Sequence, residues 1–130
     1  MLSFFQRKKK ILIIEDDENI SSMLASIVVG MGFEALTEAD GARGGQAAIK
    51  HKPALILMDI MLPTISGVDA VYLIRANPKT KNIPIIMCTA KSKVEDIEKS
   101  LAAGANDYIA KPFEVQQLRT KISKFLEIPG

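Results

Sequence analysis

The chain has 130 residues, which suits one domain of ordinary size, and its hydrophobic fraction of 48% is enough to form a core. The net charge of +2 is too small to indicate nucleic acid as a direct partner, and a single cysteine excludes an intrachain disulfide and a cysteine-built metal site. No apolar run approaches the length of a membrane span, and nothing points to an oxidising compartment, so we expect a cytoplasmic protein.

The first nine residues, 1–9, are predicted to form a tail ahead of the first strand. In the stretch "MLSFFQRKKK" apolar residues come before basic ones, whereas a signal peptide has the reverse order. Weak contact with a membrane surface is the alternative for this stretch, because apolar and basic residues together suit a lipid interface. At the other end, residues 128–130 are expected to follow the last helix.

Five short apolar runs alternate with segments of helical spacing. The runs are "ILII", "FEAL", "ALILM", "IPIIMC" and "DYIA", and their length and β-branched content predict strands that are buried on both faces. The clearest helical segment places apolar residues at steps of three and four from Ile20 to Met31, and Gly32 suits the end of that helix. Residues 115–125 repeat the pattern, while the Gly- and Ala-rich stretch 41–50 indicates a helix more weakly.

This alternation predicts an α/β domain with a parallel sheet and helices on both of its faces. In such sheets the functional crevice lies at the carboxyl ends of the strands. The first run ends in "EDDE", which contains Glu15 and Asp16, and the third run ends at Asp59. Thr89 follows the fourth run and Lys111 follows the fifth. We therefore expect carboxylates, a hydroxyl and an ammonium group to converge at one edge of the sheet.

The acidic residues at this edge indicate a metal site. If the first and third strands are neighbours, Glu15, Asp16 and Asp59 meet, and close carboxylates repel unless a cation lies among them. Carboxylate oxygens are hard ligands that suit Mg²⁺, and neither His nor Cys lies near enough in the sequence to favour zinc. Asp17 and Glu18 have a simpler interpretation, because both suit the first turn of a helix, where carboxylates meet the positive end of the helix dipole.

Four motifs together carry a resemblance to a known family. The stretches "ILIIEDDE", "LILMDIMLP", "MCTA" and "AKPF", in this order and at this spacing, resemble the receiver domain of bacterial two-component response regulators. The resemblance covers about Lys10 to Glu127, so residues 10–127 are expected to form the receiver domain. It implies a flavodoxin-like, doubly wound sheet of five parallel strands in the order 2-1-3-4-5, with five helices.

The resemblance also implies roles for the acidic residues. Asp59 matches the aspartate that takes a phosphoryl group from the phosphohistidine of a sensor histidine kinase or phosphotransfer protein. Glu15 and Asp16 match the acidic pair that holds Mg²⁺ together with Asp59, and the backbone carbonyl of Met61 matches a further ligand. Glu15 is a mild departure, because aspartate is the commoner residue at this position.

Three further residues take roles from the same resemblance. Thr89 matches the hydroxyl that contacts the bound phosphoryl group, and Lys111 matches the lysine that pairs with it. Tyr108 matches the aromatic residue that swings inward on activation, and the Lys111–Pro112 bond is typically cis. The implied protein is a signalling phosphoacceptor that catalyses its own phosphorylation and slow dephosphorylation. Its output is expected to pass through a partner protein that the sequence does not name, unless the chain is a fragment of a longer regulator.

Three other functions share parts of this pattern. A haloacid dehalogenase-like aspartyl-phosphate phosphatase needs a second acid two residues after its nucleophile, where this chain has Met61. A flavodoxin-like electron carrier must bind the FMN phosphate in its first loop, which "EDDENI" would repel. A non-phosphorylated pseudo-receiver that serves only as a docking module is the third, and the complete set of Asp59, Thr89 and Lys111 argues against it.

Overall fold

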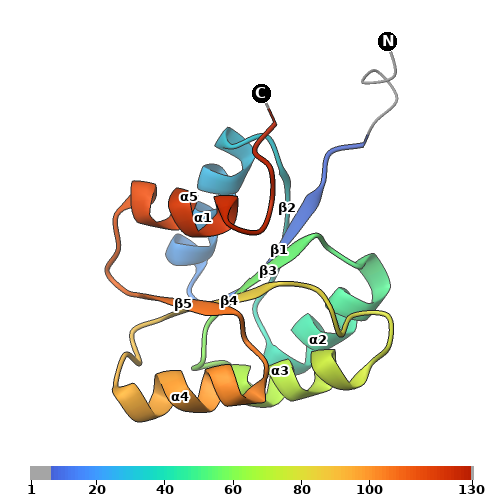
Figure 1. The fold of residues 1–130 in the computed structure, drawn as a ribbon, viewed down its shortest axis with the longest axis vertical. Helices are drawn as coiled ribbons and strands as arrows, with labels where there is room; N and C mark the ends of the chain where they lie inside the picture. Colours follow the sequence, from blue (N-terminus) through green and yellow to red (C-terminus); the bar gives the residue numbers. More distant parts are fainter. Residues whose placement is uncertain (1–6, 130) are drawn as a thin grey trace.

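Strands and helices alternate along the whole described chain. The computed structural model describes residues 7–129, which form one parallel sheet and five helices (Figure 1). Residues 1–6 of the expected tail lie outside the described residues, and residues 7–9 have no regular secondary structure. The elements in chain order are β1 (Lys10–Ile14), α1 (Glu18–Gly30), β2 (Glu34–Glu38), α2 (Gly41–His51), β3 (Leu55–Met58), α3 (Gly67–Ala76), β4 (Ile85–Thr89), α4 (Val94–Ala103), β5 (Asp107–Ala110) and α5 (Val115–Ser123).

The strand order is β2-β1-β3-β4-β5, and every pair of neighbours is parallel, so the predicted doubly wound fold is confirmed. Within this sheet Ile14 of β1 lies opposite Met58 of β3, so the residues that follow these two strands emerge side by side. Thr89 of β4 lies opposite Ala110 of β5, which places Lys111 beside the end of β4.

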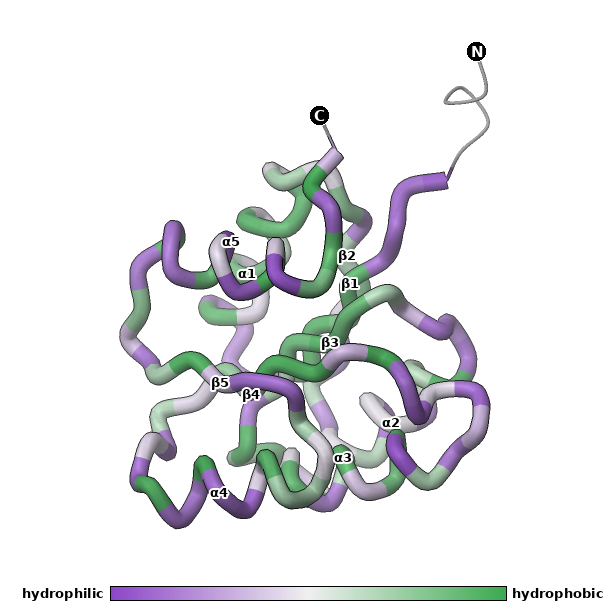
Figure 2. The backbone as a smooth tube through the Cα atoms, in the orientation of Figure 1, coloured by the Kyte–Doolittle hydropathy of each residue, from purple (hydrophilic) through white to green (hydrophobic). Residues whose placement is uncertain are grey.

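The side chains of the central strands alternate between two apolar layers. Ile11 and Ile13 of β1 face a core that α1 and α5 cover. Leu12 and Ile14 face the opposite core, which α2, α3 and the end of α4 cover. Figure 1 shows these helices on the two sides of the sheet, and Figure 2 shows the strongest hydrophobicity where the strands run between them.

The prediction that all five strands are buried on both faces is only partly correct. Every residue of β3 and β4 is buried, as are four of the five residues of β1. The prediction is wrong for β2 and β5. These are the edge strands of the sheet, and each has a side that faces solvent. An edge strand has a neighbour on one side only, and local composition does not distinguish it from a central strand.

Helix ends follow local side-chain chemistry. The Asp17 carboxylate accepts a hydrogen bond from the Ile20 N–H at 3.0 Å, so Asp17 caps the N-terminus of α1. Gly32 just after α1 and Gly104 at the end of α4 adopt φ values of 100° and 123°, which a side chain would disfavour. The Gly- and Ala-rich stretch does form α2, and Asp40 caps it through a 2.9 Å bond from the Arg43 N–H.

Arg75 near the end of α3 joins the loops at the amino edge of the sheet. Its guanidinium group donates to the backbone carbonyls of Ile83 and Gly104 at 2.7 and 2.9 Å. It also donates to the side-chain oxygen of Asn106 at 2.8 Å, and that oxygen accepts the Ile85 N–H as well. The arginine thereby ties α3 to the loops that precede β4 and β5. None of the helices built by residues 7–129 is both long and apolar enough to cross a bilayer.

Candidate functional site

Three carboxylates meet at the carboxyl edge of the sheet. Glu15 and Asp16 follow β1, and Asp59 follows the neighbouring strand β3. One carboxylate oxygen from each of the three lies within 4.8 Å of the other two. Backbone hydrogen bonds fix the arrangement, since the Asp59 N–H donates to the Ile14 carbonyl at 3.1 Å and the Glu15 N–H donates to the Glu38 carbonyl at 2.9 Å.

The three acids differ in their exposure to solvent. Glu15 is 4% exposed and Asp59 is 8% exposed, whereas Asp16 is open to solvent. Buried charged groups are costly unless they are paired or hydrogen-bonded. The two buried carboxylates therefore require positive charge nearby, and Asp16 offers a ligand from the solvent side.

Lys111 supplies this positive charge from the end of β5. Its ammonium group donates to Asp59 Oδ2 at 2.9 Å and to Glu15 Oε1, and so bridges the two buried carboxylates. The Lys111 backbone N–H donates to the Thr89 carbonyl at 2.9 Å, which extends the link between β4 and β5 by one residue. The Lys111–Pro112 peptide bond is cis, as the resemblance implied.

These contacts shift the protonation of both partners. Burial, the largest effect, raises the pKa of the Glu15 carboxyl above its ordinary value, although hydrogen bonds from Lys111 and from the Asp17 N–H oppose that change. Burial alone would lower the pKa of the Lys111 ammonium group, but its hydrogen bonds to Glu15 and Asp59 outweigh burial and hold the pKa above its usual range. Lys111 is therefore charged at neutral pH.

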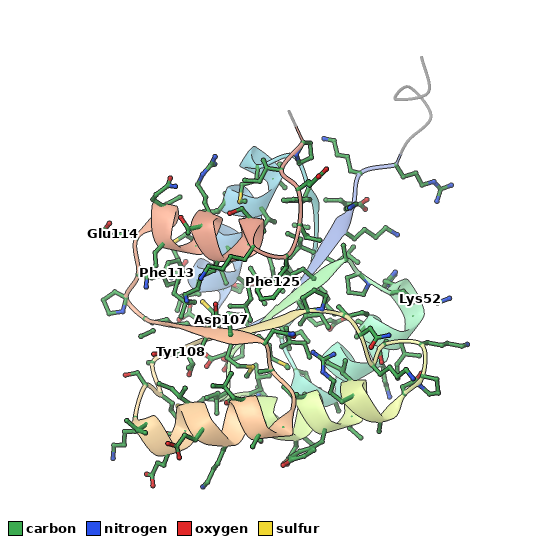
Figure 3. The ribbon with its side chains drawn as sticks, viewed as in Figure 1. Lys52, Asp107, Tyr108, Phe113, Glu114 and Phe125 are labelled. Carbon is green, nitrogen blue, oxygen red and sulfur yellow. The ribbon has the colours of Figure 1, made fainter. Side chains whose placement is uncertain are left out.

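The hydroxyl that sequence analysis singled out lies on the next strand. Thr89 is the last residue of β4, is 1% exposed and accepts the Lys91 N–H on its Oγ1 at 3.0 Å. Tyr108 lies one strand further along, in β5, where it is opposite Met87 and half-buried. Figure 3 shows Tyr108 on the same side of the view as Phe113, which follows β5. Lys121 of α5 lies 5.8 Å from the centre of the Tyr108 ring and also pairs with Asp107 at 3.1 Å.

The loop after β3 shapes the solvent side of the site. The Met61 N–H donates to Asp59 Oδ1 at 3.3 Å, while the Met61 side chain is 58% exposed. A pocket adjoining the acidic cluster is lined by Asp16, Met61 and Lys91, together with other residues of this loop. The loop thus orients the Asp59 carboxylate and leaves an open pocket beside the acidic cluster.

Gly67 is a site residue that sequence analysis missed. A Cβ atom at this position would lie 2.0 Å from the backbone carbonyl oxygen of Asp59, so only glycine fits. The Gly67 N–H donates to the Ile60 carbonyl at 2.7 Å, and Ser66 caps α3 by accepting the Asp69 N–H at 3.2 Å. The pair Ser-Gly after a loop could have marked a helix start, but nothing local reveals how near α3 comes to Asp59.

The residues at this edge fit a hard divalent cation. They offer carboxylate oxygens from three residues within a small volume, and two of these groups already share one positive charge. Mg²⁺ commonly takes one or two carboxylates and keeps several waters, which suits a cluster that is closed on one side and open at Asp16.

Comparison with known families decides the classification. Residues 11–123 match the family model described as the response regulator receiver domain. The chain belongs to this family. Receiver domains are the phosphoacceptors of two-component signalling, so this receiver domain is a phosphoacceptor in such a system.

Curated relatives of this receiver domain are longer regulators. It is 35% identical over 115 residues to the DNA-binding response regulator MtrA of Mycobacterium tuberculosis, covering 88% of this chain and 49% of MtrA. It is 37% identical over 113 residues to the transcriptional regulatory protein YrkP of Bacillus subtilis, covering 87% and 47%. The chain therefore spans about half the length of the curated relatives that it matches.

Solved receiver structures have the same fold. A response regulator from Chloroflexus aurantiacus is 34% identical with a TM-score of 0.87, and the match covers 92% of this chain and 98% of that one. The receiver domain of a sensor histidine kinase from Pseudomonas aeruginosa is 32% identical with a TM-score of 0.85, at the same coverage. That structure carries a magnesium ion in its active-site cleft.

Proposed function

We propose that Asp59 is the residue that accepts the phosphoryl group. The observation that supports this assignment most directly is that Asp59 belongs to the acidic cluster and also accepts a hydrogen bond from Lys111 at 2.9 Å. It follows the central strand β3, and the pocket lined by Asp16, Met61 and Lys91 adjoins its cluster. The proposed donor is the phosphohistidine of a sensor histidine kinase or a phosphotransfer protein.

The proposed reaction is a direct transfer between two side chains. A carboxylate oxygen of Asp59 attacks phosphorus, the bond between phosphorus and the donor histidine nitrogen breaks, and an acyl phosphate forms. Transfer of this kind depends on positioning and on electrostatic stabilisation of the phosphoryl oxygens. Lys111 supplies a fixed positive charge for these oxygens, and Thr89 supplies a hydroxyl at the same edge of the sheet.

We propose Mg²⁺ as the cofactor. Glu15, Asp16 and Asp59, with the backbone carbonyl of Met61, would hold the ion, which would neutralise charge on the transferred group. The chemistry of these donors supports the ion, because all are hard oxygen ligands. Lys111 already holds Glu15 and Asp59 in place, so the two carboxylates are arranged before any cation binds.

The rival functions fit these residues less well. The phosphatase alternative needs an acid at position 61, and the exposed Met61 side chain can neither donate nor accept a proton. A pseudo-receiver would have no use for a lysine aligned with two buried carboxylates.

Phosphorylation by acetyl phosphate, with and without Mg²⁺, tests this function. Intact-protein mass spectrometry should show one added phosphoryl group in the parent with Mg²⁺ and none in Asp59→Asn. Asp69→Asn is the matched control, since Asp69 is an exposed acid in the first turn of α3. An acyl phosphate on Asp59→Asn would overturn the assignment, and an unmodified parent would favour the docking module.

The output of the domain is a separate proposal. We propose that residues 10–127 form the receiver unit and that phosphorylation draws Thr89 towards the phosphoryl group, which lets Tyr108 move inward. This movement would bias a two-state surface formed by α4, β5 and α5 and so switch the binding of a downstream protein. We propose that the receiver itself makes no direct contact with nucleic acid, and the cytoplasmic location stays a prediction.

A further inference from the structure

The small net charge conceals a separation of charge between the two edges of the sheet. The carboxyl edge holds the acidic cluster around Asp59, together with the acidic start of α1. The opposite, amino edge holds, besides Arg75, a further eight of the seventeen Lys and Arg residues of the chain. We call this set the basic edge, and it consists of Arg7, Lys8, Lys9, Lys10, Lys50, Lys52, Lys79 and Lys81.

The topology brings these residues together from three separate segments. Residues 7–10 lead into β1, Lys50 and Lys52 lie at the end of α2 ahead of β3, and Lys79 and Lys81 lie between α3 and β4. Because β1, β3 and β4 are adjacent and parallel, their amino ends share one edge. The Ala54 N–H donates to the Lys10 carbonyl at 2.8 Å, which ties the first two segments together.

Acidic residues are sparse within the three segments of the basic edge, although Asp107 at the start of β5 and Glu127 after α5 also lie toward the amino ends of the strands. The sequence contains no Asp or Glu from residue 41 to residue 58 or from residue 70 to residue 94. Glu34, which lies opposite Lys10 in the sheet, is the acid at the start of β2. None of the eight basic side chains takes part in the ion pairs found among residues 7–129. All of them except the half-buried Lys10 are exposed, so their charge faces solvent.

Apolar side chains adjoin the basic edge. In the described part of the chain, Val29 at the end of α1 is 52% exposed. It lines a hollow together with Arg7, Lys8, Lys10 and Phe33.

We propose that the basic edge binds the surface of a bilayer that contains anionic phospholipids. Seven of its eight basic residues are lysines, whose compact, hydrated charge suits a diffuse anionic surface and lacks the fork geometry with which arginine recognises single phosphates. The exposed Val29 beside the basic edge can enter the headgroup layer, which favours a lipid surface over a nucleic acid.

This binding mode leaves the phosphorylation site accessible. Figure 3 shows Lys52 at the opposite side of the molecule from Phe113 and Glu114, which follow the carboxyl end of β5. A receiver held at a bilayer by its basic edge presents Glu15, Asp59 and Lys111 away from the lipid. A phosphoryl donor and the membrane can therefore contact the protein at the same time.

Cosedimentation of the full chain with vesicles tests the proposal. The two vesicle samples are phosphatidylcholine alone and equal parts of phosphatidylcholine and phosphatidylserine. Binding is expected to the mixed vesicles only, and to weaken as NaCl is added because salt screens the attraction. Equal binding to both kinds of vesicle, or none to the mixed vesicles, would overturn the proposal.

A charge-matched pair of triple variants locates the contact. The first variant carries Lys50→Gln, Lys79→Gln and Lys81→Gln, which remove three exposed charges from the basic edge. The backbone carbonyl of residue 81 still accepts a hydrogen bond from Arg75 in this variant. The control carries Arg43→Gln, Lys93→Gln and Lys99→Gln, which remove three exposed charges outside the basic edge. The first variant should bind the mixed vesicles at least about tenfold more weakly than the control, since each basic residue near the surface contributes to attraction.

Two further measurements separate the test of membrane binding from the test of phosphorylation. Both triple variants should still be phosphorylated by acetyl phosphate, so a loss of vesicle binding does not reflect a damaged receiver. Vesicle binding that is equal in the two variants would show that general charge, and not this edge, drives it. Duplex DNA that displaces the parent from mixed vesicles at equal phosphate concentration would overturn the lipid assignment in favour of nucleic acid.

Discussion

The Lys111 ammonium group donates hydrogen bonds to Glu15 and Asp59 at the same time, with Nζ 2.9 Å from Asp59 Oδ2. One cation therefore joins the carboxyl ends of β1, β3 and β5, three strands that are far apart in the sequence. The same carboxylates are the proposed metal ligands, so a bound cation and the lysine share the task of balancing one cluster of negative charge.

Replacing this lysine should make folding depend on metal. In Lys111→Met the two buried carboxylates lose their common partner, and we expect the free energy of unfolding to fall by about 1–3 kcal/mol at neutral pH. Mg²⁺ should restore more of this loss than it adds to the parent, because a divalent cation can replace the missing charge. Urea unfolding with Mg²⁺ or with a chelator measures both effects, and Lys99→Met, at an exposed position, is the control.

The pH dependence of the same variant gives a second readout. Burial raises the pKa of the Glu15 carboxyl in the folded state, so the folded protein binds the Glu15 proton more tightly than the unfolded protein does. The stability gained from this protonation is present at low pH and is lost as pH rises through the folded pKa. Without Lys111 this pKa should rise further. The difference in stability between parent and Lys111→Met should therefore shrink as the pH falls, and a constant difference would contradict the charge explanation.

Asp16 is expected to matter for metal and little for the fold. Its side chain is exposed and contributes one oxygen to the acidic cluster, whereas Glu15 and Asp59 are held by Lys111. Asp16→Ala should unfold like the parent in urea, yet should lose Mg²⁺-dependent phosphorylation by acetyl phosphate. Asp17→Ala, which removes the cap of α1, should show the reverse pattern, with stability reduced by about 1 kcal/mol. Parent-like metal titration of Asp16→Ala would refute the proposed site.

Two glycines provide a matched test of packing around the phosphoacceptor. In Gly67→Ala the new methyl group would overlap the Asp59 carbonyl, so α3 or the Asp59 loop must move, at a cost of about 1–3 kcal/mol. In Gly45→Ala, within α2, an added Cβ meets no atom within 4 Å, and the change should stabilise the protein by about 0.5–1 kcal/mol. Phosphorylation should slow in Gly67→Ala alone, and unchanged kinetics there would show that the loop absorbs the clash.

The lifetime of the phosphoryl group should depend on Met61. Hydrolysis of an acyl phosphate needs a water molecule in line behind phosphorus. The side chains of Met61 and Lys91 line the pocket beside the cluster, and neither can accept a proton from water at neutral pH. We expect slow dephosphorylation in the parent and faster loss in Met61→Asn, whose amide can orient water. Phosphoryl loss followed after removal of acetyl phosphate measures this, and an equal or slower loss would exclude Met61 as a determinant.

The sequence predicts the site well because parallel strands end at one edge. Runs such as "ILII" and "ALILM" identify the central strands, and each is followed at once by a residue of the candidate site. Alternation then brings Glu15, Asp59, Thr89 and Lys111 to the same edge without any knowledge of distances. The strand order could not be worked out from these runs and came from the resemblance to receiver domains.

Other features depend on distances that no local pattern contains. The bridge from Lys111 to both carboxylates joins residues 96 and 52 positions apart in the sequence. The fit of Gly67 against the Asp59 carbonyl depends on how α3 packs, and the exposure of β2 and β5 depends on their place in the sheet. Arg75 is similar, because its acceptors come from two loops and most of them are backbone atoms.

The acceptors chosen by Arg75 have a consequence for natural variation. A backbone carbonyl is present whatever residue occupies the position, so position 83 can change its side chain and keep its bond to Arg75, whereas position 104 keeps glycine because its φ is 123°. Asn106 is the exception, since its side-chain oxygen is shared between Arg75 and the Ile85 N–H. Homologues should therefore tolerate diverse residues at position 83 and keep glycine at position 104, while an arginine at position 75 and an asparagine before β5 vary together.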